Sequence, residues 1–224
     1  MALGERRQGL VELTAGVEAL EALPPEEHAR LNRQDALSSV ADISARRGSL
    51  IMQLAAMGYL ADALAMAEGY FTWAAAPAPG VAQGSSTCGD ARFGQGIVLA
   101  MLGRPSEARE AFVQALAAYR AVEHHFSVGT TAGWELRLIQ LPYRSDRVED
   151  RELLALEGEQ ALSRARDAGV VQIAPGYARL PLLLLEGRWS EAQEVARTPW
   201  RSSVTCARTP HMLWDGWRAC RAIP

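Results

Sequence analysis

The sequence predicts an all-α fold in which antiparallel helical hairpins stack on one another, and three observations support this fold class. Apolar residues recur at the three- and four-residue spacing of helix faces along most of the chain. The apolar–polar alternation that marks strands is nearly absent. A pattern of apolar helix, glycine and second helix occurs three times, which is typical of stacked helical hairpins.

Helical periodicity predicts ten helices joined by short or medium connections. They cover residues 5–21, 25–34, 36–57, 60–75, 89–102, 106–121, 125–139, 147–167, 174–186 and 189–197. The Pro-, Gly- and Ser-rich stretch AAAPAPGVAQGSSTCGD (74–90) predicts a long loop, and LPYRSD (141–146) predicts a second break. Helical amphipathicity ends after Ala196, so we expect a repeat domain over residues 1–197 and an atypical tail over 198–224.

The internal repeat has a physical explanation. Its three copies are QLAAMGYLADALAMAE (53–68), VLAMLGRPSEAREAFVQAL (98–116) and LLLLEGRWSEAQEVAR (182–197). When they are aligned on Gly58, Gly103 and Gly187, the residue five positions later is always alanine: Ala63, Ala108 and Ala192. A glycine after the first helix can adopt the left-handed conformation without a steric penalty, which allows a tight turn. Each hairpin leaves an apolar face that a neighbouring hairpin must cover, so we expect the hairpins to stack.

Residues 91–120, ARFGQGIVLAMLGRPSEAREAFVQALAAYR, resemble a tetratricopeptide repeat. The small and large positions of that family are occupied here by Gly96, Leu99, Gly103, Ala108, Phe112 and Ala115. The aromatic residue of the first helix is displaced to Phe93, and no proline closes the unit. Residues 44–73 and 176–197 match less well, since Ile51 replaces a small residue and Pro181 interrupts a helix. The resemblance implies a right-handed solenoid.

The wider chain is similar to the C-terminal helical-repeat regions of LuxR-type transcriptional regulators and large bacterial signal-transduction ATPases. The similarity lies in AAYRAVEHHFSVGTTAGWELRLIQLPYRSDR (117–147) and LPLLLLEGRWSEA (180–192). In such proteins the repeats bind or sense, while an ATPase domain and a helix-turn-helix domain act. The GxxxxGK[ST] phosphate loop is missing here, because the chain contains no lysine. The resemblance implies a fragment of such a regulator whose partner is a protein, a peptide or another domain.

Composition excludes several classes of protein. The net charge is −3 and the 23 basic residues, all arginine, are mixed with acidic ones, so no nucleic-acid-binding surface is expected. No apolar stretch is long enough to span a bilayer. Three irregularly spaced cysteines fit a reducing compartment better than a disulfide framework. We therefore expect a cytoplasmic protein without contact to membranes.

One glycine pair suggests a dinucleotide site. Gly94 and Gly96 precede an apolar run in RFGQGIVLAMLGRP (92–105), as the glycines of a phosphate-binding loop would. However, the preceding GSSTCGDA is a polar stretch and not a strand, and Leu99 stands where the third glycine is needed. The pattern therefore favours a helix of a repeat, and we expect no cofactor.

Two groups of residues suggest a metal site, and neither has the required spacing. Glu123, His124 and His125 are adjacent, so on a helix they cannot all face one ion. The spacing of Cys206, His211 and Cys220 matches no common zinc pattern. We therefore expect no metal, no catalytic residues and no enzymatic activity.

The first helices of stacked repeats line a concave surface, which could hold an apolar helix or peptide. The alignment places Met52, Phe93, Ile97, Met101 and Tyr177 in this predicted partner-binding groove, unless neighbouring helices cover them. A small-molecule-binding or enzymatic helical domain, or a truncated gene product without independent function, are the alternatives. The tail over 198–224 is either a capping helix near Met212 to Arg221 or a segment in a shifted reading frame.

Overall fold

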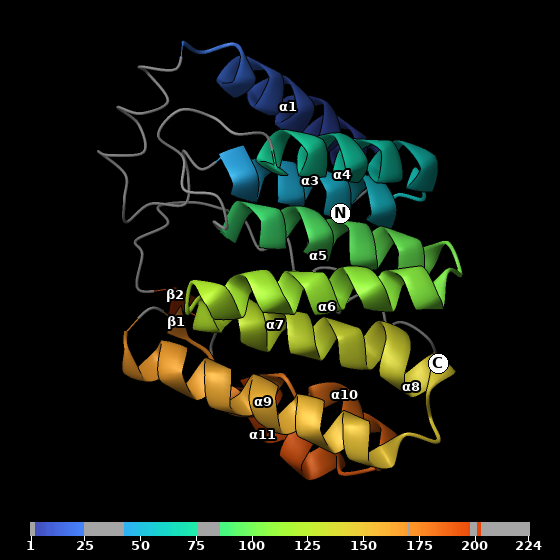
Figure 1. Cartoon of the computed structure of the whole chain (residues 1–224), viewed down its shortest axis with the longest axis vertical. Coiled ribbons are helices and arrows are strands. Elements are labelled where there is room, and N and C mark those ends of the chain that lie inside the picture. The colour runs from blue at the N-terminus through green and yellow to red at the C-terminus, as the bar shows by residue number, and fades with distance from the viewer. Residues whose placement is uncertain (1–2, 25–42, 76–85, 170, 198–200, 203–224) are drawn as a thin grey trace.

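The computed structural model describes residues 3–24, 43–75, 86–169, 171–197 and 201–202, and nearly all of them lie in helices (Figure 1). The prediction of an all-α fold is therefore confirmed. The exception within these ranges is a short antiparallel pair of strands, β1 (Val171–Gln172) and β2 (Arg201–Ser202). Apart from β2, the predicted tail over 198–224 lies outside the described residues, and so do both interpretations of it.

The described helices begin and end as follows. They are α1 (Leu3–Glu21), α3 (Ile43–Ala56), α4 (Leu60–Ala75), α5 (Ser86–Met101), α6 (Pro105–Ala121), α7 (His125–Glu135), α8 (Leu141–Tyr143), α9 (Val148–Asp167), α10 (Leu180–Leu185) and α11 (Trp189–Arg197). A π-helical turn, η1 (Leu136–Gln140), joins α7 to α8, and a 3₁₀ turn, η2 (Pro175–Tyr177), precedes α10. The helix predicted over 25–34 lies outside the described residues.

The loop predicted over 74–90 is shorter in the structure, chiefly at its second end, whereas the helix predicted over 60–75 ends where it was expected. Helix α4 continues to Ala75 and helix α5 already begins at Ser86. The residues at the start of α5 have low helix propensity, but Gly89 is buried against the ring of Tyr119. This tertiary contact holds the segment in a helix.

Prolines explain a second difference between the predicted and the observed helices. The single helix predicted over 174–186 is divided into η2 and α10. Each part has a proline in its first turn, Pro175 and Pro181, where the missing N–H and the fixed φ are tolerated. The break predicted at 141–146 starts later than expected, because α8 extends through Tyr143.

Successive helices run in alternating directions and stack along the long axis of the molecule (Figure 1). Helix α3 contacts α1, α4 and α5, and the sequence of contacts continues from α5 to α6, from α6 to α7 and from α7 to α9. The α3–α4, α5–α6 and α8–α9 turns lie together on the right-hand side of Figure 1. The α10–α11 turn faces the same way, because α11 runs back from it toward β2. We call this side of the molecule the turn edge.

The three repeat glycines adopt the left-handed conformation that their position predicts. The φ angles of Gly58, Gly103 and Gly187 are 85°, 73° and 69°. In each turn the next residue donates its N–H to the carbonyl oxygen five residues earlier: Tyr59 to Leu54, Arg104 to Leu99 and Arg188 to Leu183, all at 2.9 Å. These bonds satisfy carbonyl groups that the end of a helix otherwise leaves without a partner.

A fourth turn of the same geometry lies between α6 and α7, and it has no glycine. His124 donates its N–H to the carbonyl oxygen of Tyr119 at 2.9 Å, and Glu123 occupies the glycine position with a φ of 52°. The predicted helices 106–121 and 125–139 place a turn here, but its left-handed residue is a glutamate, which the sequence does not indicate.

Small residues bring helices α5 and α6 close together. A Cβ atom at Gly96 would lie 3.0 Å from the ring of Phe112, and one at Gly89 would lie 2.6 Å from the ring of Tyr119. Both rings are buried, and the Tyr119 hydroxyl donates to Asp90 Oδ1 at 2.6 Å. The two rings on α6 therefore lie over two glycines on α5, each pair seven residues apart.

Helices α7 and α9 use the same device, which the sequence alignment did not detect. A Cβ atom at Gly158 would lie 2.6 Å from Ala178 Cβ and 3.0 Å from Ala132 Cβ. Gly129 on α7 faces Leu162 on α9 in the same way. Close contact over small side chains therefore recurs along the stack.

The left-handed conformation of Glu123 gives the first testable prediction. An L-residue loses about 1–2 kcal/mol in this conformation, whereas glycine adopts it freely but loses about 0.5–1 kcal/mol more chain entropy on folding. Glu123→Gly should therefore raise the free energy of unfolding by up to about 1 kcal/mol, measured by urea denaturation. The reciprocal variant Gly103→Glu should lower it by at least as much. A Glu123→Gly chain that is less stable than the wild type would contradict this view of the turn.

Candidate interaction surface

The structure brings only some of the predicted groove residues together. Ile97 is buried in the core, and Met52 and Phe93, both half-buried, pack against its cluster. The ring centroid of Phe93 lies 6.2 Å from that of Phe112 and 6.4 Å from that of Trp134. These three residues of the predicted groove thus lie within the helical stack.

The other two groove residues lie elsewhere. Met101 is exposed at the end of α5. Tyr177, in η2, is half-buried and packs against the cluster that contains Leu183 and Ala192. Burial raises the pKa of the Tyr177 phenol. The five residues therefore do not form one continuous exposed surface.

The glycine, alanine and phenylalanine residues that define the three sequence repeats all take part in helix turns or helix contacts. Their side chains or backbones are placed as follows: Gly58, Gly103 and Gly187 end first helices, Gly96 faces Phe112, and Ala63, Ala108, Phe112, Ala115 and Ala192 are buried. Their role is to determine how closely the helices approach.

Gly94 and Gly96 do not form a phosphate-binding loop. Both lie in the middle of α5, which begins at Ser86, so no loop places their amide groups at a helix N-terminus. A Cβ atom at Gly94 would lie 3.4 Å from Ile51 on α3. A Cβ atom there would make an ordinary van der Waals contact with α3, whereas one at Gly96 would be crowded by the ring of Phe112.

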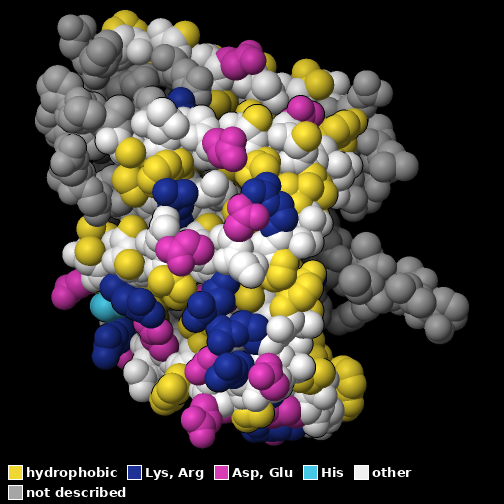
Figure 2. Space-filling model, turned by 45° about the vertical axis from the view of Figure 1, so that its right-hand side comes forward, with side chains coloured by type: hydrophobic (Ala, Val, Ile, Leu, Met, Phe, Trp, Pro, Cys, Tyr) yellow, Lys and Arg dark blue, Asp and Glu magenta, His cyan; other side chains and the backbone are white. Residues whose placement is uncertain are grey.

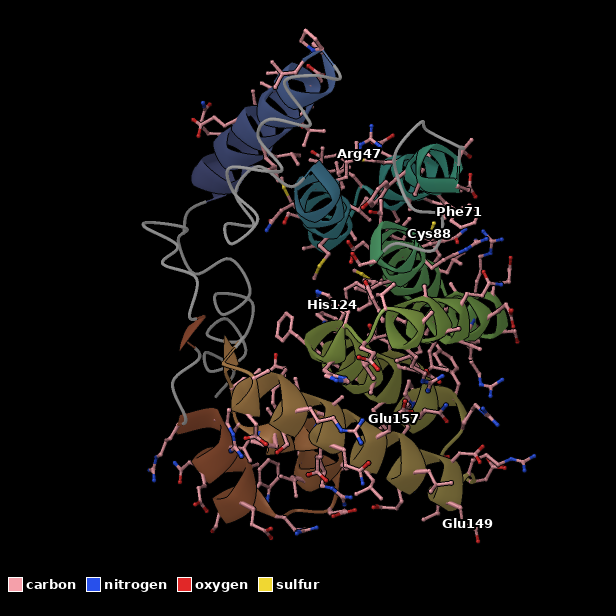
Figure 3. All side chains as sticks on the ribbon, turned by 60° about the vertical axis from the view of Figure 1, so that its left-hand side comes forward. Arg47, Phe71, Cys88, His124, Glu149 and Glu157 are labelled. Atoms are coloured by element: carbon pink, nitrogen blue, oxygen red, sulfur yellow. The ribbon has the colours of Figure 1, made fainter. Side chains whose placement is uncertain are left out.

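The histidines of the predicted polar turn lie apart from other metal-ligating groups. Figure 3 shows His124 at the start of α7, away from Cys88 and Glu157. Its ring lies 6.0 Å from that of Tyr119, between centroids. No cluster of three or more His, Cys, Asp or Glu side chains suited to a metal occurs in the described ranges. Cys206, His211 and Cys220 fall outside those ranges.

Sequence reasoning missed a row of buried polar residues along α7 and η1. Thr131, Glu135 and Gln140 are all almost fully buried, and Gln140 Nε2 donates to Glu135 Oε1 at 2.8 Å. A regular α-helix would bring Ile139 into line with Glu135. The π-helical turn inserts one residue, so that Gln140 takes this place instead. The signal in the sequence was polar residues spaced by four and then five in an otherwise apolar helix.

Burial changes the pKa of the Glu135 carboxyl group. Loss of hydration raises the pKa of its carboxyl group, although the hydrogen bond from Gln140 and the nearby guanidinium groups of Arg109, Arg144 and Arg120 oppose this shift. Arg120, on α6, is itself paired with Glu157 on α9, with both N–O distances at 2.7 Å. Glu135 thus lies inside the stack, where the hydrogen bond from Gln140 joins it across the π-helical turn.

Exposed apolar side chains gather at the turn edge. Of the twelve large hydrophobic side chains that are exposed among the described residues, seven flank the four turns at this edge: Tyr59, Met101, Leu102, Tyr143, Val148, Leu185 and Trp189. We call these seven residues the turn-edge row. Figure 2, with this side brought forward, shows hydrophobic side chains at successive levels, interrupted by charged ones. The row is the clearest candidate for a contact surface.

Comparisons with protein-family models, with curated proteins and with solved structures find no match. The resemblance to tetratricopeptide repeats and to LuxR-type regulators thus rests on the residues of this chain alone. Within the described ranges, no helix has the length and apolar character needed to cross a bilayer.

The raised pKa of Glu135 predicts a pH dependence of stability. An acid whose pKa is higher in the folded chain than in the unfolded chain loses stability as the pH rises from about 4.3, its unfolded value, through its folded pKa. Glu135→Gln keeps the hydrogen bond from Gln140 and removes the charge. The variant should therefore be more stable than the wild type at pH 8, and this difference should shrink toward pH 4, as measured by thermal unfolding.

A matched control is Glu110→Gln on α6. Glu110 also accepts a hydrogen bond from a glutamine on its own helix, Gln114 Nε2 at 2.8 Å, but its side chain is exposed. This change should leave the difference between the pH 8 and pH 4 stabilities close to that of the wild type. A Glu135→Gln chain with the wild-type pH profile would show that the buried carboxyl group does not influence stability.

Proposed function

We propose that this chain is a non-catalytic protein-interaction or sensing module, built from tetratricopeptide-like hairpins stacked as a right-handed solenoid. Three glycine-ended first helices and the small residues at the α5–α6 contact support this architecture. By its resemblance to LuxR-type and signal-transduction ATPase regulators, it is a cytoplasmic part of a bacterial regulator. Its partner is a protein, a peptide or another domain of that regulator.

The observation that carries this proposal is the turn-edge row. Large apolar side chains exposed singly are ordinary, but their concentration over successive layers is typical of a protein-binding surface. Seven of the twelve in the described chain flank turns at one edge. A binding event at this edge would contact several layers at once and could alter how they pack.

A small-molecule-binding helical domain is the competing function, and one observation favours it. The buried Thr131 Oγ1 and Gln140 Oε1 atoms have no hydrogen-bond partner among the residues that the structure describes. Buried polar atoms of this kind are normally satisfied by protein, water or a ligand. The polar row beside Glu135 is therefore the place where a small polar ligand would bind, if the chain binds one.

Ligand titration separates the two functions. A ligand present at 100 times its Kd adds about 2.7 kcal/mol to the stability of the folded chain, which corresponds to roughly 5–10 °C in Tm for a chain of this size. With an interaction module, we expect nucleotides, Mg²⁺ and Zn²⁺ at millimolar concentration to change Tm by less than about 1 °C. A saturable rise of several degrees with any of them, abolished by Gln140→Leu, would favour the small-molecule function.

A further inference from the structure

We propose that the turn-edge row is the contact surface for a second copy of this chain, so that two chains associate about a two-fold axis. The proposal rests on the proposed function of an interaction module and specifies the partner.

The position of the row follows the repeat. Met101 and Leu185 stand two residues before Gly103 and Gly187, at the same place in two different turns. Pro105 and Trp189 likewise share the first position of a second helix. The α5–α6 and α10–α11 turns thus present an apolar side chain at the same place on one edge, and the α8–α9 turn lies between them on that edge (Figure 1).

The area of the row matches one side of a protein dimer. Its seven side chains are between 38% and 65% exposed. Since an aromatic side chain offers roughly 150–250 Å² and an aliphatic one somewhat less, the row presents on the order of 600 Å². A standard interface buries about 800 Å² on each partner, of which a little over half is apolar. The row therefore supplies about the apolar area that one partner contributes to a stable dimer.

Three ion pairs within the chain lie beside the row. Arg104 Nη2 lies 2.5 Å from Glu107 Oε2, and Arg188 Nη2 lies 2.6 Å from Glu191 Oε2. Arg144 Nη2 lies 3.1 Å from Asp150 Oδ2. An edge rich in one sign of charge would repel its own copy and select an oppositely charged partner. An edge with balanced charges can face itself, as a two-fold interface requires, because the same residues then meet on both sides.

Sedimentation equilibrium of the full chain tests the proposal. Between about 1 and 100 μM, a range that spans typical dimer affinities, we expect the weight-average mass to rise from that of the monomer to that of the dimer. The double variant Met101→Glu with Leu185→Glu places like charges in the contact and should weaken association at least about 100-fold. The matched control is Leu153→Glu, on α9 and outside the row, because Leu153 is 67% exposed and Leu185 is 62% exposed. This control should associate as the wild type does.

Circular dichroism melting should show that both variants fold as the wild type does. If the Glu variant melts early, Met101→Gln with Leu185→Gln replaces it, and it should also weaken association. A wild-type chain that is monomeric at 100 μM overturns the proposal and leaves a different protein as the occupant of the row. The proposal is also overturned if the row variants still form the dimer, or if the Leu153→Glu control weakens association as much as they do. The ligand titration tests the interaction function separately, since its result does not depend on dimer formation.

Discussion

The contact between Phe112 and Gly96 sets the distance between α5 and α6, and the rest of the stack follows the same constraint. A Cβ atom at Gly96 would lie only 3.0 Å from the ring, so a larger residue here would require the ring or the helix to move by a few tenths of an ångström. Gly129 under Leu162 and Gly158 under Ala132 extend the same rule to helices α7 and α9. Protein interiors are packed densely, so small residues at contacts fix where large ones fit.

This packing separates the inside of the stack from its edge. Inside the stack, alanines and glycines pack against aromatic rings and branched side chains. Among the described residues, the charged residue that is buried there is Glu135, which accepts a hydrogen bond from Gln140. At the turns the chain reverses direction, and the side chains there have no helix to cover them. Several of these positions hold large apolar residues. The proposals for function therefore concern the turn edge, whereas the residues Ile97 and Phe93, predicted for a groove, contribute to the core.

Sequence reasoning succeeded where one residue type has one structural consequence. Glycine in a left-handed turn is such a case, and Gly58, Gly103 and Gly187 were identified from spacing alone. It failed where a tertiary contact decides the local structure. Glu123 adopts the same turn although nothing in a glutamate indicates it. Helix α5 begins early because of a contact 30 residues away in sequence, between Gly89 and Tyr119. The π-helical turn that aligns Glu135 with Gln140 is likewise set by the packing around it.

A double-mutant cycle on Gly96 and Phe112 tests the central constraint most directly. The free energy of unfolding is measured for Gly96→Ala, for Phe112→Leu and for both together. The helix propensity gained by Ala over Gly is the same in both backgrounds, so it cancels and the cycle isolates the contact. If the ring determines the approach of the helices, Gly96→Ala should be at least about 1 kcal/mol less favourable with Phe112 than in the Phe112→Leu background. Additivity within about 0.5 kcal/mol would show that this contact does not set the spacing.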